Sequence, residues 1–190
     1  MKTTNQKINS KRKHTIANPA ERKRVLVTIS LGIIFLTTAV IFINNAIANY
    51  MPMQSRSYRE LYKNAASISR ILFFFVIAIY PVFWLLRNKS DKVLNLIERF
   101  NLKPTLRFLG KTLRQWHVPI AIIGVSIVLI HVYMVLISGF KFNTKYISGL
   151  AALIVLFIQC ISGVFKYKGI GRKWHISLGI LFIALMLIHG

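Results

Sequence analysis

The sequence predicts an all-α integral membrane protein, a helical bundle of about five transmembrane helices. Hydrophobic residues make up 55% of the 190-residue chain, which is more than a soluble domain of this length usually contains. The apolar residues also gather into long runs, and a helix that crosses a bilayer needs roughly 20 mostly apolar residues. Five runs meet or approach this length, at 25–48, 71–86, 118–140, 147–165 and 175–190. The second and fifth are short, so we expect these helices to stand nearly upright or the bilayer to thin around them.

The segments between these runs are polar and basic. Residues 1–24 are rich in Lys, Asn and Thr, a composition that cannot bury a core, and we interpret them as a basic cytoplasmic tail. The connection 49–70 is expected to be a loop with one amphipathic turn through Leu61 and Tyr62. In the connection 87–116 we expect two helices on the membrane surface, one starting at Ser90 and one at Pro104.

The distribution of Lys and Arg predicts how the chain crosses the membrane. Of the 26 Lys and Arg residues, 20 lie in the segments 1–24, 87–116 and 166–174, and 6 lie in the alternate segments 49–70 and 140–146. By the positive-inside rule the N-terminus is cytoplasmic and the C-terminus extracytoplasmic. The formal charge of +22 is thereby explained by topology and by attraction to anionic lipid, without nucleic acid.

The first run requires one further decision, because 46–48 reads Ala-Ile-Ala and resembles a signal-peptide cleavage site. The apolar run before it is longer than a usual signal core. We therefore expect an uncleaved anchor in the cytoplasmic membrane, which is the first span of a membrane domain over 25–190.

An internal repeat is the most informative feature of the sequence. Residues 114–131 and 172–189 match at seven of eighteen positions, and most of the other positions exchange one apolar residue for another. Each copy begins with Arg, places Trp-His at its third and fourth positions, and ends with Leu-Ile-His. Four of the five histidines belong to this pattern: His117, His131, His175 and His189.

The spacing of these histidines predicts two stacked sites. Fourteen residues of α-helix rise about 21 Å and return to within roughly 40° of the starting direction. One helix lies between the two copies in sequence, so the copies cross the membrane in the same direction. His117 is then expected to face His175 toward the cytoplasm, and His131 to face His189 toward the outside.

Two facing histidines at each level indicate two b-type haems. An imidazole inside a bilayer needs a partner, and bis-histidine haem iron is suited to electron transfer. Gly124 lies seven residues from both His117 and His131, where a missing side chain allows close approach. Further residues are expected near the haems: Gly179 and Phe182 in the fifth run, Arg114, Arg172 and Lys173 at the inner propionates, and Lys141 and Lys145 at the outer haem.

Other interpretations of the same residues remain open. The four histidines all lie near the ends of apolar runs, so they can be residues of the membrane–water interface. The glycines can serve helix packing, and the cations can serve membrane topology. Zinc fits less well, because the two levels are too far apart to share an ion. A second class of function is a haem-free membrane assembly factor or small-solute carrier. Its polar interior would come from Gln159, Cys160 and Ser162, or from Asn44 and Asn45.

At these histidines the chain resembles the transmembrane cytochrome b architecture of ferric-reductase-like membrane proteins, which include NADPH oxidases and the haem-binding subunit of the methionine sulfoxide reductase system. It also resembles cytochrome b of quinol-oxidising complexes. The resemblance covers 114–190, the expected haem-binding three-helix core. It implies that the four histidines are axial ligands and that electrons cross the membrane through two haems.

The sequence departs from the ferric-reductase pattern after His189. Those proteins usually have another span there, and many carry a flavin and nicotinamide domain, whereas no Gly-rich dinucleotide motif after a strand is found in this sequence. We expect a separate cytoplasmic donor, a flavoprotein or a membrane quinol, and an extracytoplasmic acceptor, although the opposite direction of flow is also allowed. Whether the outer haem reduces a small substrate itself, which would make the protein an enzyme, stays open.

Overall fold

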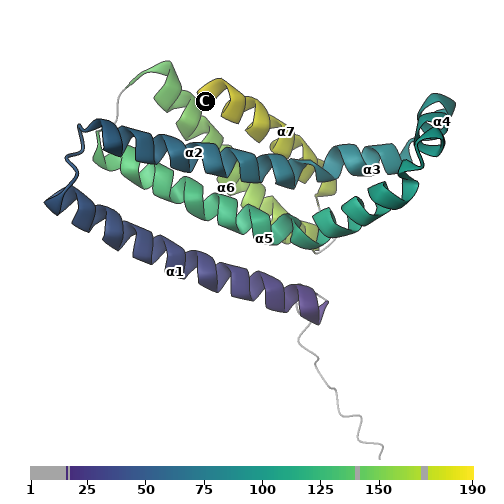
Figure 1. Cartoon of the computed structure of the whole chain (residues 1–190), viewed down its shortest axis with the longest axis horizontal. Coiled ribbons are helices and arrows are strands. Elements are labelled where there is room, and N and C mark those ends of the chain that lie inside the picture. Colours follow the sequence, from purple (N-terminus) through teal and green to yellow (C-terminus); the bar gives the residue numbers. More distant parts are fainter. Residues whose placement is uncertain (1–15, 17, 140–141, 168–170) are drawn as a thin grey trace, which may run out of the picture.

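The computed structural model describes residue 16 and residues 18–139, 142–167 and 171–190, and all regular secondary structure in these ranges is α-helical. The all-α prediction is confirmed for this part of the chain. Seven helices follow one another: α1 (Pro19–Asn49), α2 (Arg56–Ile77), α3 (Ile79–Arg87), α4 (Asp91–Arg99), α5 (Leu102–Ile137), α6 (Thr144–Tyr167) and α7 (Arg172–His189). Figure 1 shows α1, α2, α5, α6 and α7 side by side as a bundle, with α4 projecting from one end.

Four helical segments are long and apolar enough to cross a membrane: α1, α2 with α3, α5 and α6. α7 is a shorter apolar helix. Large apolar side chains on the outside of the bundle are widely exposed, including Phe42 and Phe157 at 67% and Ile188 at 66%. A protein in water would bury many of these side chains, whereas lipid solvates them. The structure is that of a multi-pass membrane protein.

The helices pack in two groups. α5 packs along α2 on one side and α1 on another, and α6 packs along α7. One buried cluster, Ile43, Tyr58, Ile130 and Met134, joins α1, α2 and α5. A second cluster, Phe73, Ala152, Leu156, Phe182 and Met186, joins α2 to α6 and α7. α2 therefore connects the two groups and packs with helices of the segment 114–190.

The prediction that 49–70 is a loop was wrong. α2 begins at Arg56, fifteen residues before the apolar run at 71–86, and the hydroxyl of Ser55 caps it by accepting a hydrogen bond from the backbone N–H of Tyr58. Polar residues in this first part hid the helix, but Tyr58 is fully buried and its hydroxyl donates to the carbonyl of Met134 at 2.8 Å. With α3 the segment reaches 32 residues, so the second span is not short.

A break at Ala78 separates α2 from α3. Pro81 has no N–H to donate to the carbonyl of Ile77 and its ring crowds that carbonyl, which is the usual cause of a helix break one turn before a proline. The carbonyl of Ile77 therefore lacks the hydrogen bond that residue 81 would otherwise donate within the helix.

The helix predicted to start at Ser90 is confirmed, since α4 begins at Asp91 with Ser90 as its N-cap. The separate surface helix predicted at Pro104 was wrong. α5 starts at Leu102 and continues for 36 residues through the membrane, so the third span begins well before residue 118. Pro104 lies in the first turn, where no intrahelical hydrogen bond is lost. Pro119 lies inside the helix, and the α5 ribbon bends in its N-terminal half (Figure 1).

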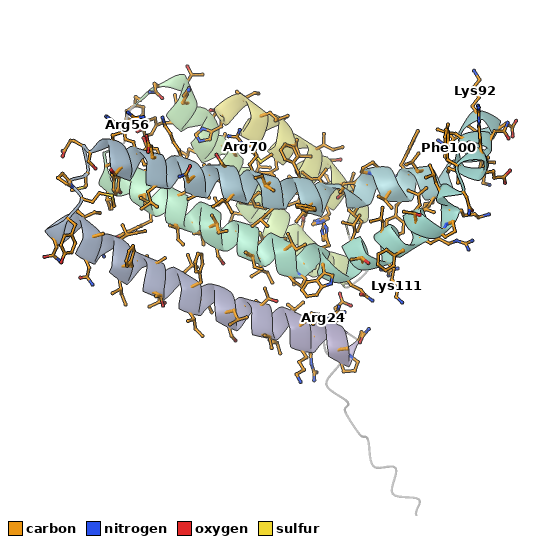
Figure 2. The ribbon with its side chains drawn as sticks, viewed as in Figure 1. Arg24, Arg56, Arg70, Lys92, Phe100 and Lys111 are labelled. Carbon is orange, nitrogen blue, oxygen red and sulfur yellow. The ribbon has the colours of Figure 1, made fainter. Side chains whose placement is uncertain are left out.

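Aromatic and cationic side chains mark the ends of the bundle. Trp84 is exposed near the end of α3 and Trp174 near the start of α7, and Trp116 is exposed within α5, one residue before His117. Tryptophans are enriched in this way at membrane interfaces. Figure 2 shows Arg24, Lys92 and Lys111 toward this same end, and Arg56 at the opposite end. We call the tryptophan end inner and the other end outer, following the predicted topology.

Candidate functional site

The structure brings the four repeat histidines together in the pairs that the spacing predicts. The ring centres of His117 and His175 lie 6.4 Å apart, and those of His131 and His189 lie 6.3 Å apart. We call the first pair the inner level and the second pair the outer level. The two levels are one 14-residue step apart along both α5 and α7, or about 21 Å.

Three of the histidines are oriented by backbone carbonyls. Nδ1 of His117 lies 3.1 Å from the carbonyl of Val76, and Nδ1 of His131 lies 2.8 Å from that of Tyr62. Nδ1 of His189 lies 2.7 Å from the carbonyl of Lys145. A carbonyl can only accept, so each Nδ1 carries the proton and each Nε2 carries the lone pair. This is the tautomer of a histidine that binds metal through Nε2.

His175 reaches the same tautomer by another route. The hydroxyl of Ser162 donates to the carbonyl of Gln159 at 2.8 Å. Its oxygen must therefore accept at its second contact, which is Nδ1 of His175 at 2.8 Å. His175 is also the most deeply buried of the four, at 7% exposure.

Two pairs of residues around the histidines repeat at the spacing of the histidines themselves. Tyr62 and Val76 are fourteen residues apart on α2, and Gly149 and Gly163 are fourteen residues apart on α6. Helices α2 and α6 run antiparallel to α5 and α7, so equal steps along each helix lead from one level to the other. Residues 147–149 and 161–163 both read Ile-Ser-Gly. This second repeat is a signal in the sequence that the prediction from the histidines alone did not use.

The two glycines of α6 make room for the histidines of α7. A Cβ atom on Gly149 would lie 2.5 Å from Cε1 of His189, and one on Gly163 would lie 3.5 Å from Cε1 of His175. The first distance is far inside van der Waals contact and the second is ordinary contact. The outer level therefore requires glycine at 149, whereas the inner level has room for a methyl group at 163.

The glycines predicted from the sequence have different neighbours. Gly179 makes room for the amide of Gln159, whose Nε2 lies 3.4 Å from Nε2 of His175. Oε1 of Gln159 is a buried oxygen without a hydrogen-bond partner among the described residues. The inner level thus contains a polar side chain beside the nitrogen that would bind metal, and the amide of this side chain is a hydrogen-bond donor.

The space between the levels is filled by aromatic rings. Phe73 of α2 packs edge-to-face on Phe182 of α7, with ring centres 4.9 Å apart. A Cβ atom on Gly124 would lie 3.3 Å from the Phe73 ring, so Gly124 is approached closely by Phe73. Gly124 and Phe182 each lie seven residues from both histidines of their helix. Phe182 therefore lies between the two levels, as its position in the repeat predicts.

The cations predicted at the haems lie in several places. Arg114 and Lys173 are exposed near the inner level, while Lys141 and the side chain of Arg172 lie outside the described residues. Lys145 contributes its backbone carbonyl to His189. The outer loop predicted at 49–70 included Arg70, but this residue lies within α2, and its Nη1 donates to the carbonyl of Gly190 at 3.4 Å. Figure 2 shows Arg70 along α2, away from both ends of that helix.

Several polar side chains considered for a carrier hold helices together. Asn44 accepts a hydrogen bond from the hydroxyl of Tyr133 at 2.5 Å, which joins α1 to α5. Ser162 and Gln159 contact His175. Asn45 bonds within its own helix through its carbonyl, and Cys160 is exposed.

Each level offers a metal two imidazoles. No group of three His, Cys, Asp or Glu side chains suited to one ion occurs in the described ranges. A structural zinc site uses four protein ligands, whereas a haem brings four nitrogens of its own and takes two axial ligands from the protein. A metal–imidazole bond is about 2.0 Å and the nitrogen lies about 1.2 Å from the ring centre, so two imidazoles on one iron have centres about 6.4 Å apart. Both pairs have ring centres at about this separation, which is compatible with bis-histidine haem.

Comparisons of the chain with protein-family models, with curated proteins and with solved structures found no match.

Proposed function

We propose that this protein is a di-haem b electron-transfer protein that carries electrons across the cytoplasmic membrane. The observation that supports this function best is the pair of histidine levels. Each level holds two imidazoles with ring centres 6.4 or 6.3 Å apart, and each imidazole is oriented by a hydrogen bond at Nδ1.

Each supporting residue has a defined task in this proposal. His117 and His175 hold the inner haem, and His131 and His189 hold the outer haem. The carbonyls of Val76, Tyr62 and Lys145 and the hydroxyl of Ser162 fix the imidazole planes and raise the basicity of Nε2. A haem bound at these ligands supplies one-electron chemistry, with a potential set by ligation, hydrogen bonds and burial.

The packing between the levels keeps this path dry. Phe73 and Phe182 fill the space with apolar rings, which lowers the local dielectric and excludes ions. With two haems the crossing becomes two shorter steps, from a flavoprotein or quinol at the inner level to an acceptor outside. No acid, base or nucleophile is needed in either step.

Transfer across the membrane can be tested in proteoliposomes that contain ferricyanide. When a membrane-impermeant reductant is added outside, ferricyanide inside should be reduced only in vesicles that contain the protein. A variant with His117→Ala and His175→Ala is the control, and it should behave as empty vesicles. Equal rates for the two proteins would contradict transmembrane transfer through this path.

Ser162→Ala is expected to disturb the inner haem alone. The substitution removes the acceptor from Nδ1 of His175, and loss of such an outer-shell partner typically costs about 10–100-fold in metal affinity. Haem titration of the purified variant should show one weakened site of the two.

The matched control is Ser148→Ala at the equivalent outer position. The hydroxyl of Ser148 donates to the carbonyl of Lys145, and Nδ1 of His189 bonds to that carbonyl and not to the hydroxyl, so both sites should bind as in the parent. Weakening of both sites by Ser162→Ala would show a general loss of stability and contradict the assigned role.

Arg70→Gln is expected to lower the midpoint potential of the outer haem. A cation within α2 favours the reduced, less positive iron and stabilises a propionate. At an effective dielectric constant near 20, a charge about 8 Å away contributes about 2 kcal/mol, or roughly 90 mV. Potentiometric titration should show one lowered potential, and an unchanged pair of potentials would place Arg70 outside the outer site.

A further inference from the structure

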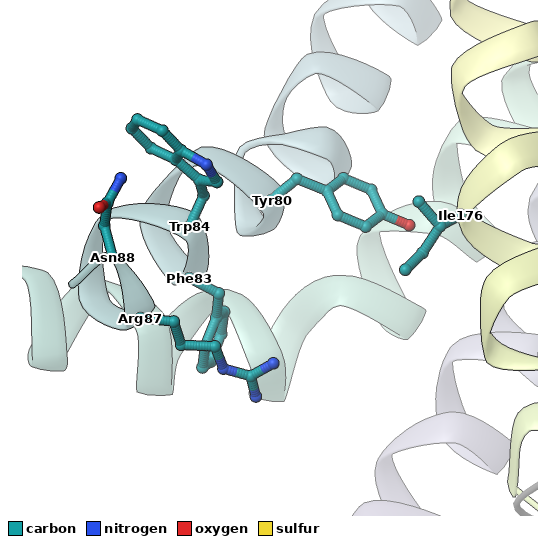
Figure 3. Close-up of a pocket in the computed structure, with 6 residues that line it drawn as sticks. All are labelled: Tyr80, Phe83, Trp84, Arg87, Asn88 and Ile176. Carbon is teal, nitrogen blue, oxygen red and sulfur yellow. The ribbon is translucent and has the colours of Figure 1, made fainter. Parts of the chain in front are cut away.

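A pocket of about 520 Å³ lies between α3 and the beginning of α7. Its wall consists of Tyr80, Phe83, Trp84, Arg87, Asn88 and Ile176. Figure 3 shows the Tyr80 ring reaching across the pocket so that its hydroxyl points toward Ile176, while Trp84 and Phe83 lie on opposite sides of α3.

This pocket adjoins the inner histidine level. Ile176 follows His175 directly in α7. The hydroxyl of Tyr80 would lie 3.8 Å from a Cβ atom on Gly179, one turn after His175. A small molecule in the pocket is therefore close to the inner haem that the proposed function requires.

The side chains of the wall match an uncharged aromatic molecule with hydroxyl groups. Three aromatic rings and one isoleucine form apolar walls, and the polar groups among them are one hydroxyl, one amide and one guanidinium. The guanidinium of Arg87 is held over the Phe83 ring at 5.5 Å from its centre. Pockets for small organic ligands have this mixture of apolar surface and a few polar groups, with volumes of about 300–1,000 Å³.

The place of the pocket indicates that its ligand comes from the membrane. Trp84 is 61% exposed and stands at the inner end of a membrane helix, where tryptophans occupy the interface between lipid and water. A dinucleotide would need several phosphate contacts, but the pocket wall contains one cation and no glycine-rich turn.

We propose that this pocket binds the head group of a membrane quinol, which donates electrons to the inner haem; this assignment rests on the proposed function. The hydroxyl of Tyr80 and the amide of Asn88 pair with the quinol hydroxyls, and Arg87 stabilises the negative charge that develops when a hydroxyl loses its proton. Oxidation breaks the two O–H bonds of the quinol and forms the quinone. Two protons would pass to water at the inner surface, and two electrons would pass one at a time to a ferric haem held by His117 and His175, the first moving on to the outer haem before the second arrives.

Filling the pocket tests this assignment directly. Ile176→Trp puts a large ring into the pocket, and Ile180→Trp, at an exposed position one turn later in α7, is the matched control. Haem content is counted first, and reduction of the haems by a short-chain quinol is then followed by stopped flow. We expect Ile176→Trp to keep two haems and full reduction by dithionite but to be reduced by the quinol at least tenfold more slowly, while Ile180→Trp stays at the parent rate.

Two results would overturn the proposal. The first is an unchanged rate of haem reduction by the quinol in Ile176→Trp. The second is loss of the inner haem from this variant, which would show that the pocket holds an edge of the porphyrin. Tyr80→Phe keeps the ring and removes the hydroxyl, so it should slow reduction of the haems by the quinol. This variant tests the pocket even if Ile176→Trp does not fold.

A measurement that needs no haem separates this proposal from the proposed function. A photoreactive azidoquinone is added to the full chain in membranes, and the labelled peptides are mapped. We expect label on α3 and at the start of α7, and we expect less of it when excess unlabelled quinone competes for the pocket. Label there on a protein that contains no haem would keep the pocket assignment and reject electron transfer, whereas label spread evenly over the apolar helices would reject the pocket.

Discussion

Replacing both histidines of one level is expected to remove one haem and leave the other in place. In the variant with His117→Ala and His175→Ala, haem b should fall from about two to about one per chain, because each iron depends on its own pair of imidazoles. The remaining haem should keep a low-spin spectrum, since His131 and His189 retain their bonds to the carbonyls of Tyr62 and Lys145. Pyridine haemochrome measurement on the purified protein gives the count.

The reciprocal variant, with His131→Ala and His189→Ala, should retain the inner haem alone, and the two variants should differ in midpoint potential. His14→Ala is the control for a histidine outside the repeat. Retention of two haems by either double variant would show that the levels are not the ligand sets. Loss of both haems from each would show that the sites form only together.

Gly149→Ala is expected to affect the outer site almost as strongly as removing a ligand. The added methyl group would lie 2.5 Å from Cε1 of His189, about 1 Å inside normal contact. Overpacking of this kind costs about 1–3 kcal/mol, which either separates α6 from α7 or turns the imidazole away from His131. Haem titration should show an outer site weakened by about tenfold or more.

Gly163→Ala is a demanding control because it makes the same chemical change at the equivalent inner position. Its Cβ atom would meet Cε1 of His175 at 3.5 Å, which is ordinary contact, so the inner haem should remain bound. Equal effects at 149 and 163 would mean that the two levels are packed alike and that the close approach at His189 is not structurally important.

The histidine pairs could be predicted from the sequence because they depend on helix geometry alone. A step of fourteen residues returns to the same face of any α-helix, and the number of crossings between the copies fixes which histidines share a level. The start of α4 was predicted for a similar reason, since Ser90 and Asp91 form a local N-terminal signal that needs no tertiary context.

The partners of the histidines were harder to predict because they are mostly backbone groups. Carbonyls of Val76, Tyr62 and Lys145 accept from three of the four rings, and a carbonyl is present at every residue. Only the position of α2 beside α5, and of α6 beside α7, selects these three. Ser162 and Gly149 do have a sequence signature, the repeated Ile-Ser-Gly, but it becomes meaningful once α6 is placed against α7.

The helix boundaries were missed where polar residues continue an apolar helix. Residues 56–70 contain four Lys or Arg, which suggested a loop, yet the buried Tyr58 and the N-cap Ser55 hold this segment as the first part of α2. Residues 102–117 were likewise separated from the span that follows. In both cases tertiary packing extended a helix beyond its apolar part, which hydropathy alone does not detect.

The most direct test of the two haem sites is the haem content of the purified chain. A dithionite-reduced minus oxidised spectrum shows the type and spin state of the haem, and the pyridine haemochrome gives its amount per chain. We predict close to two b-type haems per chain with a low-spin α-band, because four imidazoles occupy two levels. Absence of haem after expression with ample haem supply would contradict this prediction and leave the four histidines as paired polar residues that join helices of the bundle.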